Sequence, residues 1–524
     1  VDFIKHQEGV SIFSDQFSTY HGICECQVLS PTACKYPGTL FRFPLRSKPS
    51  DISAHCPSPG ELSKKLAQLA QGADQLLVFL QHVREISVEL IEQSGKRELL
   101  CHWQAEVSKH IAGDPLVDRL LFNTTQRYSS WSGLSKALVT ISRNTAEPLH
   151  TVYKLSTRNE PRDLTSSWLV VGMFGGAASV KSADKLKSRT GGSALAPWIA
   201  IAAKLNDASL RIEPVAGELH RFLPTTISTD LPVHISAFFV LSGVGLSLAA
   251  QDEAGQWNSS LIENDAPRAY AILVSGLKAM IEQGDERMTD DMASTVYSVL
   301  PLDSPKESRW ESLQCNVLEE VTSTVPFLWT SAGRGQWVKL TSATILDRQS
   351  FNDQRLAGFA KDVLVTIGDS HVGHNTCGAN EDLLSRILDL SGRKSCALTC
   401  QSFFRDKFMS NLPSLTDEQA DNGLKMLIRL GRDQPDTCSW SVPLLRVNKC
   451  VRSQAGQLCL PEELIVPHTK DERIRYLFKN RPSIWPSDTL RDMSGFLSEK
   501  NLLLSAVENL PISLLLQEAE HLAE

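Results

Sequence analysis

The sequence lacks the long apolar runs that a membrane protein needs. Its longest runs, such as Val78–Leu80 and Trp168–Val171, are far shorter than the roughly 20 residues that span a bilayer. It also lacks an excess of positive charge, because 53 Lys and Arg stand against 60 Asp and Glu, for a formal net charge of -7. We therefore expect no membrane partner and no nucleic-acid partner.

Cysteine is sparse as well. Twelve Cys in 524 residues is about 2%, whereas small disulfide scaffolds carry about 8–10%. Reduced, mostly buried thiols are the expected state, and they are typical of a cytoplasmic protein. No basic-then-apolar leader opens the sequence, which begins at Val1 without an initiator Met. We expect it to be a piece of a longer chain.

The composition that remains is that of an ordinary globular protein, with 42% hydrophobic and 22% charged residues. At about 150 residues per domain, the length predicts three or four domains. The expected fold class is α+β and multi-domain, with mixed sheets, packed helices and a helix-richer C-terminal part. The expected segments are residues 1–46, 47–165, 166–350 and 351–524.

The clearest local signal is a helix start. Ser58–Glu61 is a capping-box pattern with proline in the first helical position. Seven apolar residues then follow at steps of three or four, which predicts one amphipathic helix that continues to Val83. We expect the stripe to face the core, with a groove for a partner as the alternative. Its members are Leu62, Leu66, Leu69, Ala73, Leu76, Leu80 and Val83.

Apolar runs and alternation predict further elements, and no repeat of 20–50 residues is visible. The expected strands are Leu40–Phe43, Ile86–Leu90, Arg97–Trp103, Trp168–Phe174, Trp198–Ala203, Leu219–Leu223, Val233–Leu241, Trp337–Leu340 and Val363–Ile367. The expected helices are Trp131–Val139, Ala266–Ile281, Trp310–Val321, Asp382–Leu390 and Thr416–Leu430, the last with a capping box of Thr416 and Gln419.

One motif is compatible with a nucleophile. Ser370 lies in the run Gly368–His371 directly after the apolar stretch Val363–Ile367, and several hydrolases present a serine in a sharp turn after a strand. The run resembles the first block of the esterases named for their Ser-Gly-Asn-His residues. Those enzymes also need a late Asp-x-x-His, and none follows Ser370. We expect a loop and no enzyme, with a serine esterase that uses Ser370 and His371 or His374 as a lesser alternative.

A metal site near the same place is a second hypothesis. Five metal-capable side chains lie close in sequence, but structural zinc sites normally use paired Cys-x2–4-Cys or His-x3–5-His ligands, and the His-x2-His spacing of His371 and His374 is tight for both rings to converge. We expect a glycine-containing loop and assign no metal site. The five residues are His371, His374, Cys377, Cys396 and Cys400.

Glycines cluster around the end of the expected strand that finishes at Phe174. Gly172, Gly175 and Gly176 do not follow the G-x-G-x-x-G order, and no P-loop pattern occurs in the chain. We expect glycines that serve the end of a strand, not a nucleotide site.

Several blocks, in order, resemble the repeating region of the sacsin family of giant co-chaperones. The resemblance covers residues 1–340 well and the rest loosely. After Ser242 the family usually continues with Asn-Arg-Arg, whereas Gly243, Val244 and Gly245 stand here. The blocks are Gly38–Arg46, Ala73–Leu80 with Val83–Val88, Ser167–Val170 with Ala196–Trp198, Gly217–Pro224, Leu231–Ser242 with Trp257 and Asn258, and the weaker Leu460–Leu464 with Ile474–Phe478.

The first block implies a nucleotide-binding neighbour. In the family it closes an ATPase-like domain similar to the N-terminal domain of the ninety-kilodalton heat-shock chaperone. The resemblance implies that Gly38 and Thr39 match a Gly-Thr pair beneath the adenine, so these two are the cofactor-binding candidates. A threonine that caps its own turn is the structural alternative for Thr39. The other nucleotide-binding residues would precede Val1, so we expect no cofactor in this segment and ATP only in the full-length protein.

The resemblance also implies a function. The sacsin family acts in protein quality control and is linked to the seventy-kilodalton heat-shock system. We therefore expect a cytoplasmic co-chaperone segment with protein clients, either client-binding or structural, and without chemistry of its own. The alternative is an architectural scaffold between repeats.

Overall fold

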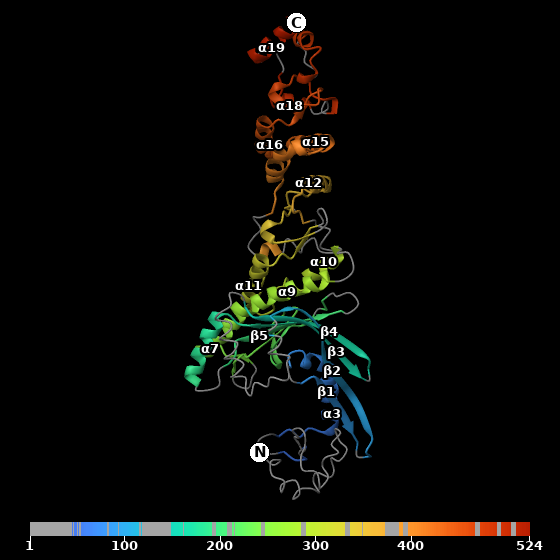
Figure 1. Ribbon diagram of the computed structural model, residues 1–524, viewed down its shortest axis with the longest axis vertical. Coiled ribbons are helices and arrows are strands. Elements are labelled where there is room, and N and C mark those ends of the chain that lie inside the picture. The colour runs from blue at the N-terminus through green and yellow to red at the C-terminus, as the bar shows by residue number, and fades with distance from the viewer. Residues whose placement is uncertain are drawn as a thin grey trace. The chain divides into compact units, whose positions relative to one another are not determined.

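The computed structural model describes most of the chain from Leu45 onward (Figure 1). The expected strand Leu40–Phe43, the expected helix Trp131–Val139 and the candidate residues Gly38 and Thr39 lie outside the described residues. The residues outside the description are 1–44, 46, 50, 52–53, 81–82, 93, 115–116, 118–147, 161, 191–194, 207–211, 214, 243–246, 284–289, 331–335, 348, 373–386, 391–396, 467–471, 490–493, 505–509 and 524.

The chain forms two units, residues 1–71 and residues 72–524. The described part of the first unit is mainly helix α3 (Pro59–Gln71). The capping box is confirmed, because the Glu61 backbone N–H donates to Ser58 Oγ at 3.2 Å and the Ser58 N–H donates to Glu61 Oε2 at 2.8 Å. The helix itself is shorter than expected.

The prediction of one helix as far as Val83 is wrong. Helix α3 ends at Gln71, Gly72 follows with φ -107° and ψ 12°, and a second short helix, α4 (Ala73–Leu77), begins the second unit. Glycine is among the poorest helix formers because its backbone has the most freedom to lose, so a break at Gly72 is reasonable. The stripe does not face the core throughout: Leu62 and Leu69 are 37% and 43% exposed, whereas the fully buried residue of α4 is Leu77, which is not part of the stripe.

An eight-stranded mixed sheet is the centre of the second unit, with strand order β1-β2-β3-β4-β5-β8-β6-β7. All neighbours are antiparallel except β6 and β8, which are parallel. The strands are β1 (Glu85–Ile91), β2 (Arg97–Gly113), β3 (His150–Glu160), β4 (Leu164–Phe174), β5 (Trp198–Leu205), β6 (Glu218–Arg221), β7 (Leu223–Ser228) and β8 (His234–Ala237).

The expected strands from Ile86 to Ala203 are confirmed, and β1 and β2 form the expected hairpin with Gly95 at φ +81° in its turn. The strand expected at Val233–Leu241 ends earlier, at Ala237. The sheet also crosses the expected boundary between residues 165 and 166, since β4 spans it and pairs with β3. The four-domain division otherwise stays a prediction.

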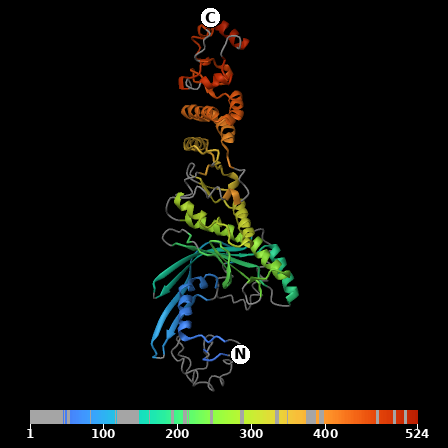
Figure 2. The same ribbon diagram turned by 180° about the vertical axis from the view of Figure 1, so that it is seen from behind.

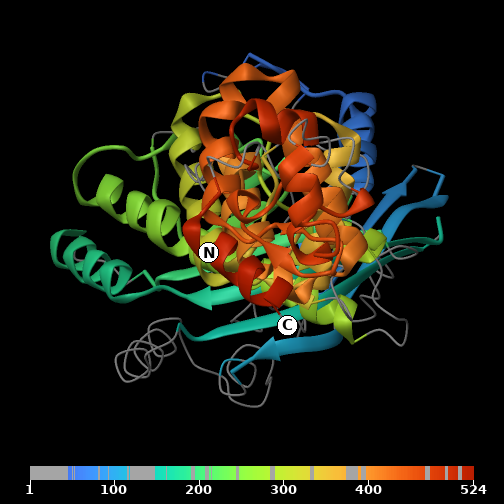
Figure 3. The same ribbon diagram turned by 90° about the horizontal axis from the view of Figure 1, so that it is seen from above.

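One face of the sheet packs against helices. Leu169, Ile201 and Ile235 point to this face and join a core with α9 (Ala266–Glu282) and α11 (Glu311–Thr324). These two helices, both expected, lie on the same side of the sheet with α10 (Asp290–Tyr297) (Figures 1 and 2). The hairpin of β1 and β2 and the helix α7 (Ala177–Thr190) lie toward opposite ends of the sheet (Figure 3).

A second, mainly helical core contains residues from Leu346 to Leu503, although Val372, Ile387 and Leu388 belong to the core beneath the sheet. The prediction of a strand at Val363–Ile367 is wrong, because Val363 to Thr366 belong to helix α12 (Gln354–Thr366). Asp353 caps this helix by accepting the Arg355 backbone N–H at 2.8 Å. The helix expected at Thr416 is confirmed as α15 (Asp417–Asp433), including its capping box with Gln419. Of the helix expected at 382–390, residues 387–390 are described and are helical.

The remaining elements are short. Together with the elements above they confirm the α+β class. Among the described helices, none combines the length and the hydropathy of a membrane span. The remaining short elements are β9 (Leu241–Ser242), β10 (Ser247–Leu248), β11 (Leu328–Thr330), β12 (Gln336–Val338), β13 (Val451–Arg452), β14 (Leu458–Cys459), α8 (Asp252–Ser259), α14 (Cys400–Ser402), α16 (Pro435–Val447), α17 (Glu472–Leu477), α18 (Ser494–Glu499), α19 (Ile512–Ala523), the π-helices η1 (Ser260–Asp265) and η6 (Phe403–Met409), and the 3-10 turns η2 (Ser308–Trp310), η3 (Leu340–Ser342), η7 (Leu412–Ser414), η8 (Pro461–Glu463) and η9 (Pro482–Ile484).

Candidate functional site

Ser370 does not follow a strand, so the structural basis of the nucleophile hypothesis is wrong. It lies just after the end of α12, where Gly368 adopts φ +72°. Its neighbours have structural partners: Asp369 accepts from Lys407 Nζ at 2.6 Å and from the Thr344 hydroxyl, and His371 Nδ1 lies 3.2 Å from the Thr344 carbonyl oxygen. The backbones of Thr344 and His371 also pair as an isolated parallel bridge, with the Thr344 N–H donating to the Ser370 carbonyl oxygen at 2.9 Å and the Val372 N–H donating to the Thr344 carbonyl oxygen at 3.0 Å.

The metal hypothesis is addressed only in part by the described residues. His374, Cys377 and Cys396 lie outside them, and the described residues contain no group of three side chains able to hold a metal ion. Cys400 is buried, and burial raises the pKa of its thiol to about 12. This thiol is therefore protonated at neutral pH, which makes it a poor ligand in this conformation.

Four aromatic side chains from separate parts of the second unit meet on the face of the sheet opposite α9. Each comes from one of the sequence blocks that carry the resemblance: Phe79, Trp168, His220 and His234. The His220 ring is 5.0 Å from the Phe79 ring and 5.0 Å from the His234 ring, and the Trp168 and His234 rings are 5.7 Å apart, all between centroids. We call these four residues the histidine cluster.

Strand register explains why these residues meet. Side chains alternate between the two faces of a sheet, and β6 pairs with β8 so that His220 is opposite Ser236. On the next strands His234 is opposite Ala202, and Lys204 is opposite Trp168. All of these residues therefore point to one face.

The segment of residues 73–80 covers the cluster. Its helix α4 ends at Leu77, and the following residues bring Phe79 onto the His220 ring; both Leu77 and Phe79 are buried. At its other end the Asp74 carboxylate is also buried and lies 3.9 Å from Lys204 Nζ. We call residues 73–80 the latch segment.

The histidine cluster is uncharged at neutral pH. Burial lowers the pKa of His220 to about 3, helped by the neighbouring His234. Burial also lowers the pKa of His234 to about 4, helped by the positive charge of Lys204. Two neutral imidazoles with pKa values this low cannot act as general acid and base near pH 7, where catalytic groups need pKa values close to the working pH.

The cluster also holds polar atoms with few partners. The Glu218 backbone N–H donates to His234 Nδ1 at 3.2 Å, which places the His234 proton on Nε2. Several buried atoms here lack a hydrogen-bond partner within the described part of the chain: both ring nitrogens of His220, Nε2 of His234 and the indole nitrogen of Trp168. Buried polar atoms without partners are uncommon and are often functional. Sequence reasoning missed both histidines, although two histidines in otherwise apolar strands were the available signal.

A second arrangement holds a hairpin. Asn258 accepts the Val240 N–H at 2.9 Å and donates to the carbonyl oxygens of Val240 at 2.8 Å and Ala249 at 2.9 Å. Trp257 donates its indole N–H to the Phe238 carbonyl oxygen at 2.9 Å. Helix α8 thus fixes both ends of the hairpin of β9 and β10. Residues 243–246 at its tip, where the sequence departs from the family, lie outside the described residues.

Gly172 within β4 and Gly176 just after it both lie where the chain is closely packed. A Cβ on Gly172 would lie 2.3 Å from the Trp198 ring. Gly176 donates its N–H to the buried carboxylate of Asp265 at 3.1 Å, and the Ser179 hydroxyl donates to the same carboxylate. The chain's own carboxylate therefore occupies the start of helix α7, where an anion is favoured.

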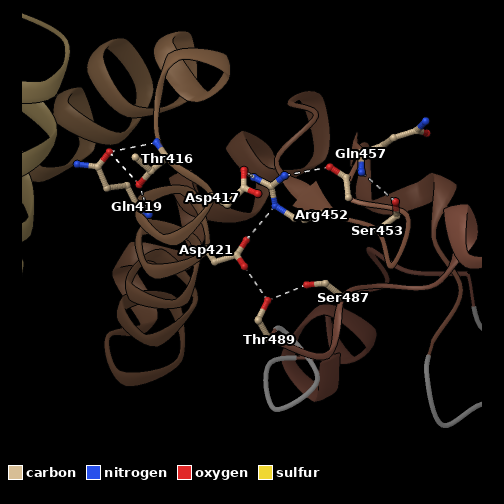
Figure 4. A network of polar contacts seen from close by, with 10 residues as sticks. Thr416, Asp417, Gln419, Asp421, Arg452, Ser453, Gln457, Ser487 and Thr489 are labelled. Carbon is tan, nitrogen blue, oxygen red and sulfur yellow. Dashed lines mark hydrogen bonds and ion pairs between the residues drawn. The ribbon is translucent and has the colours of Figure 1, made fainter.

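In the C-terminal part, one arginine joins three segments (Figure 4). Arg452 Nη2 lies 2.8 Å from Asp417 Oδ1, and its Nε lies 3.6 Å from Asp421 Oδ1. The Thr489 hydroxyl donates to Asp421 at 2.7 Å, and the Ser487 backbone N–H donates to the Arg452 carbonyl oxygen at 2.8 Å. This network ties β13 and residues 487–489 to α15, which is a structural role.

The comparisons with known proteins agree with the sequence resemblance. The family model described as Sacsin domain matches residues 2–101. The Homo sapiens protein Sacsin is 27% identical over 349 residues, which are 63% of this chain and 7% of Sacsin. The chain thus spans a small part of the length of that relative. No solved structure matches the chain. The resemblance to sacsin is therefore confirmed.

Proposed function

We propose that this sacsin-like chain is a segment of a cytoplasmic co-chaperone in protein quality control, which binds protein clients or holds neighbouring parts of a longer chain and has no chemistry of its own. The observation that carries the proposal is the similarity to Sacsin over 63% of the chain. The heat-shock chaperone system is the proposed partner. ATP belongs to the full-length protein, where Gly38 and Thr39 would contribute to its site.

Exposed apolar side chains near the C-terminal end support client binding. Tyr476 on α17 is 84% exposed, and Ile512 and Leu516 on α19 are 75% and 60% exposed. Ile512 and Leu516 are four residues apart on one helix and therefore share a face. Exposed apolar side chains that share a face, as Ile512 and Leu516 do, are typical of sites of protein interaction, and unfolded clients offer apolar segments.

Suppression of aggregation tests the proposal. We expect the chain, at near-stoichiometric ratio, to reduce light scattering from a heated model protein. The variant that combines Tyr476→Ser, Ile512→Ser and Leu516→Ser should suppress less. Leu223→Ser is the matched control, because Leu223 is 54% exposed but lies on β7.

Two outcomes would contradict client binding. One is no suppression by a chain whose circular dichroism shows an intact fold. The other is equal suppression by the triple variant and the Leu223→Ser control, which would remove the support from α17 and α19. The first outcome would favour the architectural scaffold.

A further inference from the structure

The latch segment is bound to the sheet mainly by apolar and aromatic contacts. Helix α4 contacts β1, β2, β3 and β7. Leu77, Val78 and Phe79 are buried there, and the Phe79 ring meets His220 edge to face. The attachment of the latch segment therefore depends on the histidine cluster beneath it staying uncharged.

Among the described residues, neither His220 nor His234 has a hydrogen-bond acceptor for the proton that each ring would gain. When His234 is protonated, Nδ1 changes from acceptor to donor, and it then faces the Glu218 backbone N–H, which is also a donor. His220 has no hydrogen-bond partner for either ring nitrogen among the described residues. Each imidazolium would be a buried charge without a matched acceptor, which is costly.

The charged groups around the cluster do not remove this cost. Lys204 on β5 lies near His234 and opposes a second positive charge. The carboxylate that the latch segment offers, Asp74, is shared with Lys204 Nζ at 3.9 Å, and Glu213 lies 3.4 Å from the same nitrogen. Glu218 on β6 is the remaining carboxyl nearby, and burial raises its pKa.

Among the other strands, β2 adds the imidazole of His110 to this face, opposite Tyr153 with the ring centroids 6.3 Å apart, and an imidazole supplies no negative charge. Register and alternation place Cys101, Trp103 and Ala105 of β2, and Tyr153 and Leu155 of β3, on the side of Trp168. Strand β7 carries no titratable side chain between Leu223 and Ser228. An added proton on either histidine is therefore not compensated from these elements.

We propose that the histidine cluster makes residues 73–80 an acid-sensitive latch, in which protonation of His220 or His234 releases this segment from the sheet. The closed form excludes the proton and the open form accepts it. Opening would expose Phe79 and Trp168 together with both imidazoles. Protonation would thus detach from the sheet a segment that almost directly follows the first unit in sequence.

The direction and range follow from linkage. A histidine with a lower pKa in the closed form than its ordinary 6.5 favours closure above pH 6.5, and this preference is lost as the pH falls. Between pH 7 and pH 5, the opening equilibrium should rise roughly 20-fold for each histidine. Both histidines act in the same direction.

Hydrogen exchange of the intact chain measures the opening. We expect the amides of residues 73–80 to lose protection between pH 7 and pH 5, after correction for the intrinsic effect of pH on exchange. The variant His220→Phe with His234→Asn should keep its protection, because phenylalanine keeps the ring against Phe79 and asparagine keeps an acceptor for the Glu218 N–H. His521→Gln, at an exposed position on α19, is the control and should behave as the wild type.

A second measurement works on the wild-type chain alone, in case the double variant does not fold. Exchange of the imidazole C2 hydrogen reports the pKa of each histidine by mass spectrometry. We expect His220 and His234 to titrate well below the ordinary histidine value of 6.5. Titration of either near 6.5 in the folded chain would overturn the proposal, as would pH-independent protection of residues 73–80 or an equal loss in wild type and double variant.

Discussion

The Ser179 hydroxyl donates a hydrogen bond to the buried carboxylate of Asp265, 86 residues further along the chain. Asp265 ends the π-helix η1 and also accepts the Gly176 N–H at the start of α7. Burial raises the pKa of Asp265 from 3.8 to about 6, although both hydrogen bonds act in the other direction. The carboxylate therefore links α7 to η1, but its two hydrogen bonds do not fully replace the water that it loses on burial.

Asp265→Asn should therefore change the pH dependence of stability. An acid whose pKa is raised on folding costs stability above its folded pKa, and the cost disappears as the pH falls toward the unfolded value. We expect the melting temperature of the variant, relative to wild type, to be higher at pH 7 than at pH 4.5, by an amount that corresponds to roughly 2 kcal/mol. Asp163→Asn, at an exposed position, is the control. A difference that does not vary with pH would contradict the assignment.

Gly172→Ala should destabilise the sheet. The added Cβ would lie 2.3 Å from the Trp198 ring, and both residues belong to central strands. Overpacking of this kind costs about 1–3 kcal/mol. Gly358→Ala is the matched control, because its Cβ meets nothing within 4 Å on helix α12, and alanine there should stabilise by about 0.5–1 kcal/mol. Thermal unfolding of both variants checks the pair, and equal effects would contradict the packing described for β4 and β5.

Arg452→Met should loosen the C-terminal part. It keeps much of the side-chain volume but leaves Asp421, which is largely buried, without its cation. Loss of one partner of a buried charged pair costs about 3–5 kcal/mol when burial is complete, so a smaller loss is expected here. Arg158→Met removes a surface arginine that is 61% exposed and is the control. Exchange protection in α15 should fall only in the Arg452 variant; unchanged protection in both would remove the network's stabilising role.

Local signals predicted the parts of the fold that local contacts decide. The capping boxes at Ser58 and Thr416 were predicted correctly because each depends on side chains three residues apart. Buried strands such as β4 were predictable because a continuous apolar run between turns favours a strand covered on both faces.

The stretch Val363–Ile367 shows where such signals are insufficient. Five mostly apolar residues fit a strand or a helix equally well. Here they form the end and the C-cap of helix α12, because they continue an apolar helix face that includes Leu356 and Phe359 and that begins after the Asp353 cap. The histidine cluster depends on long-range pairing. His220 and His234 meet because β6 and β8 are parallel neighbours, which neither segment's own sequence specifies.

Asn258→Asp should release the hairpin of β9 and β10. The asparagine amide donates to the carbonyl oxygens of Val240 and Ala249. An aspartate oxygen there would face both acceptors without a proton, and buried polar groups that lose their partners cost about 1–3 kcal/mol each. Asn258→Ala loses the same bonds but adds no charge, so it should be less harmful at pH 7. Below the raised pKa that burial would give the aspartate, its carboxyl can donate again, and the variant should recover part of its stability while the alanine variant does not. Amide exchange of residues 238–249 measures this, with Asn316→Asp on the exposed side of α11 as the control. Equal protection in the aspartate and wild-type chains at pH 7 would show that Asn258 does not hold the hairpin.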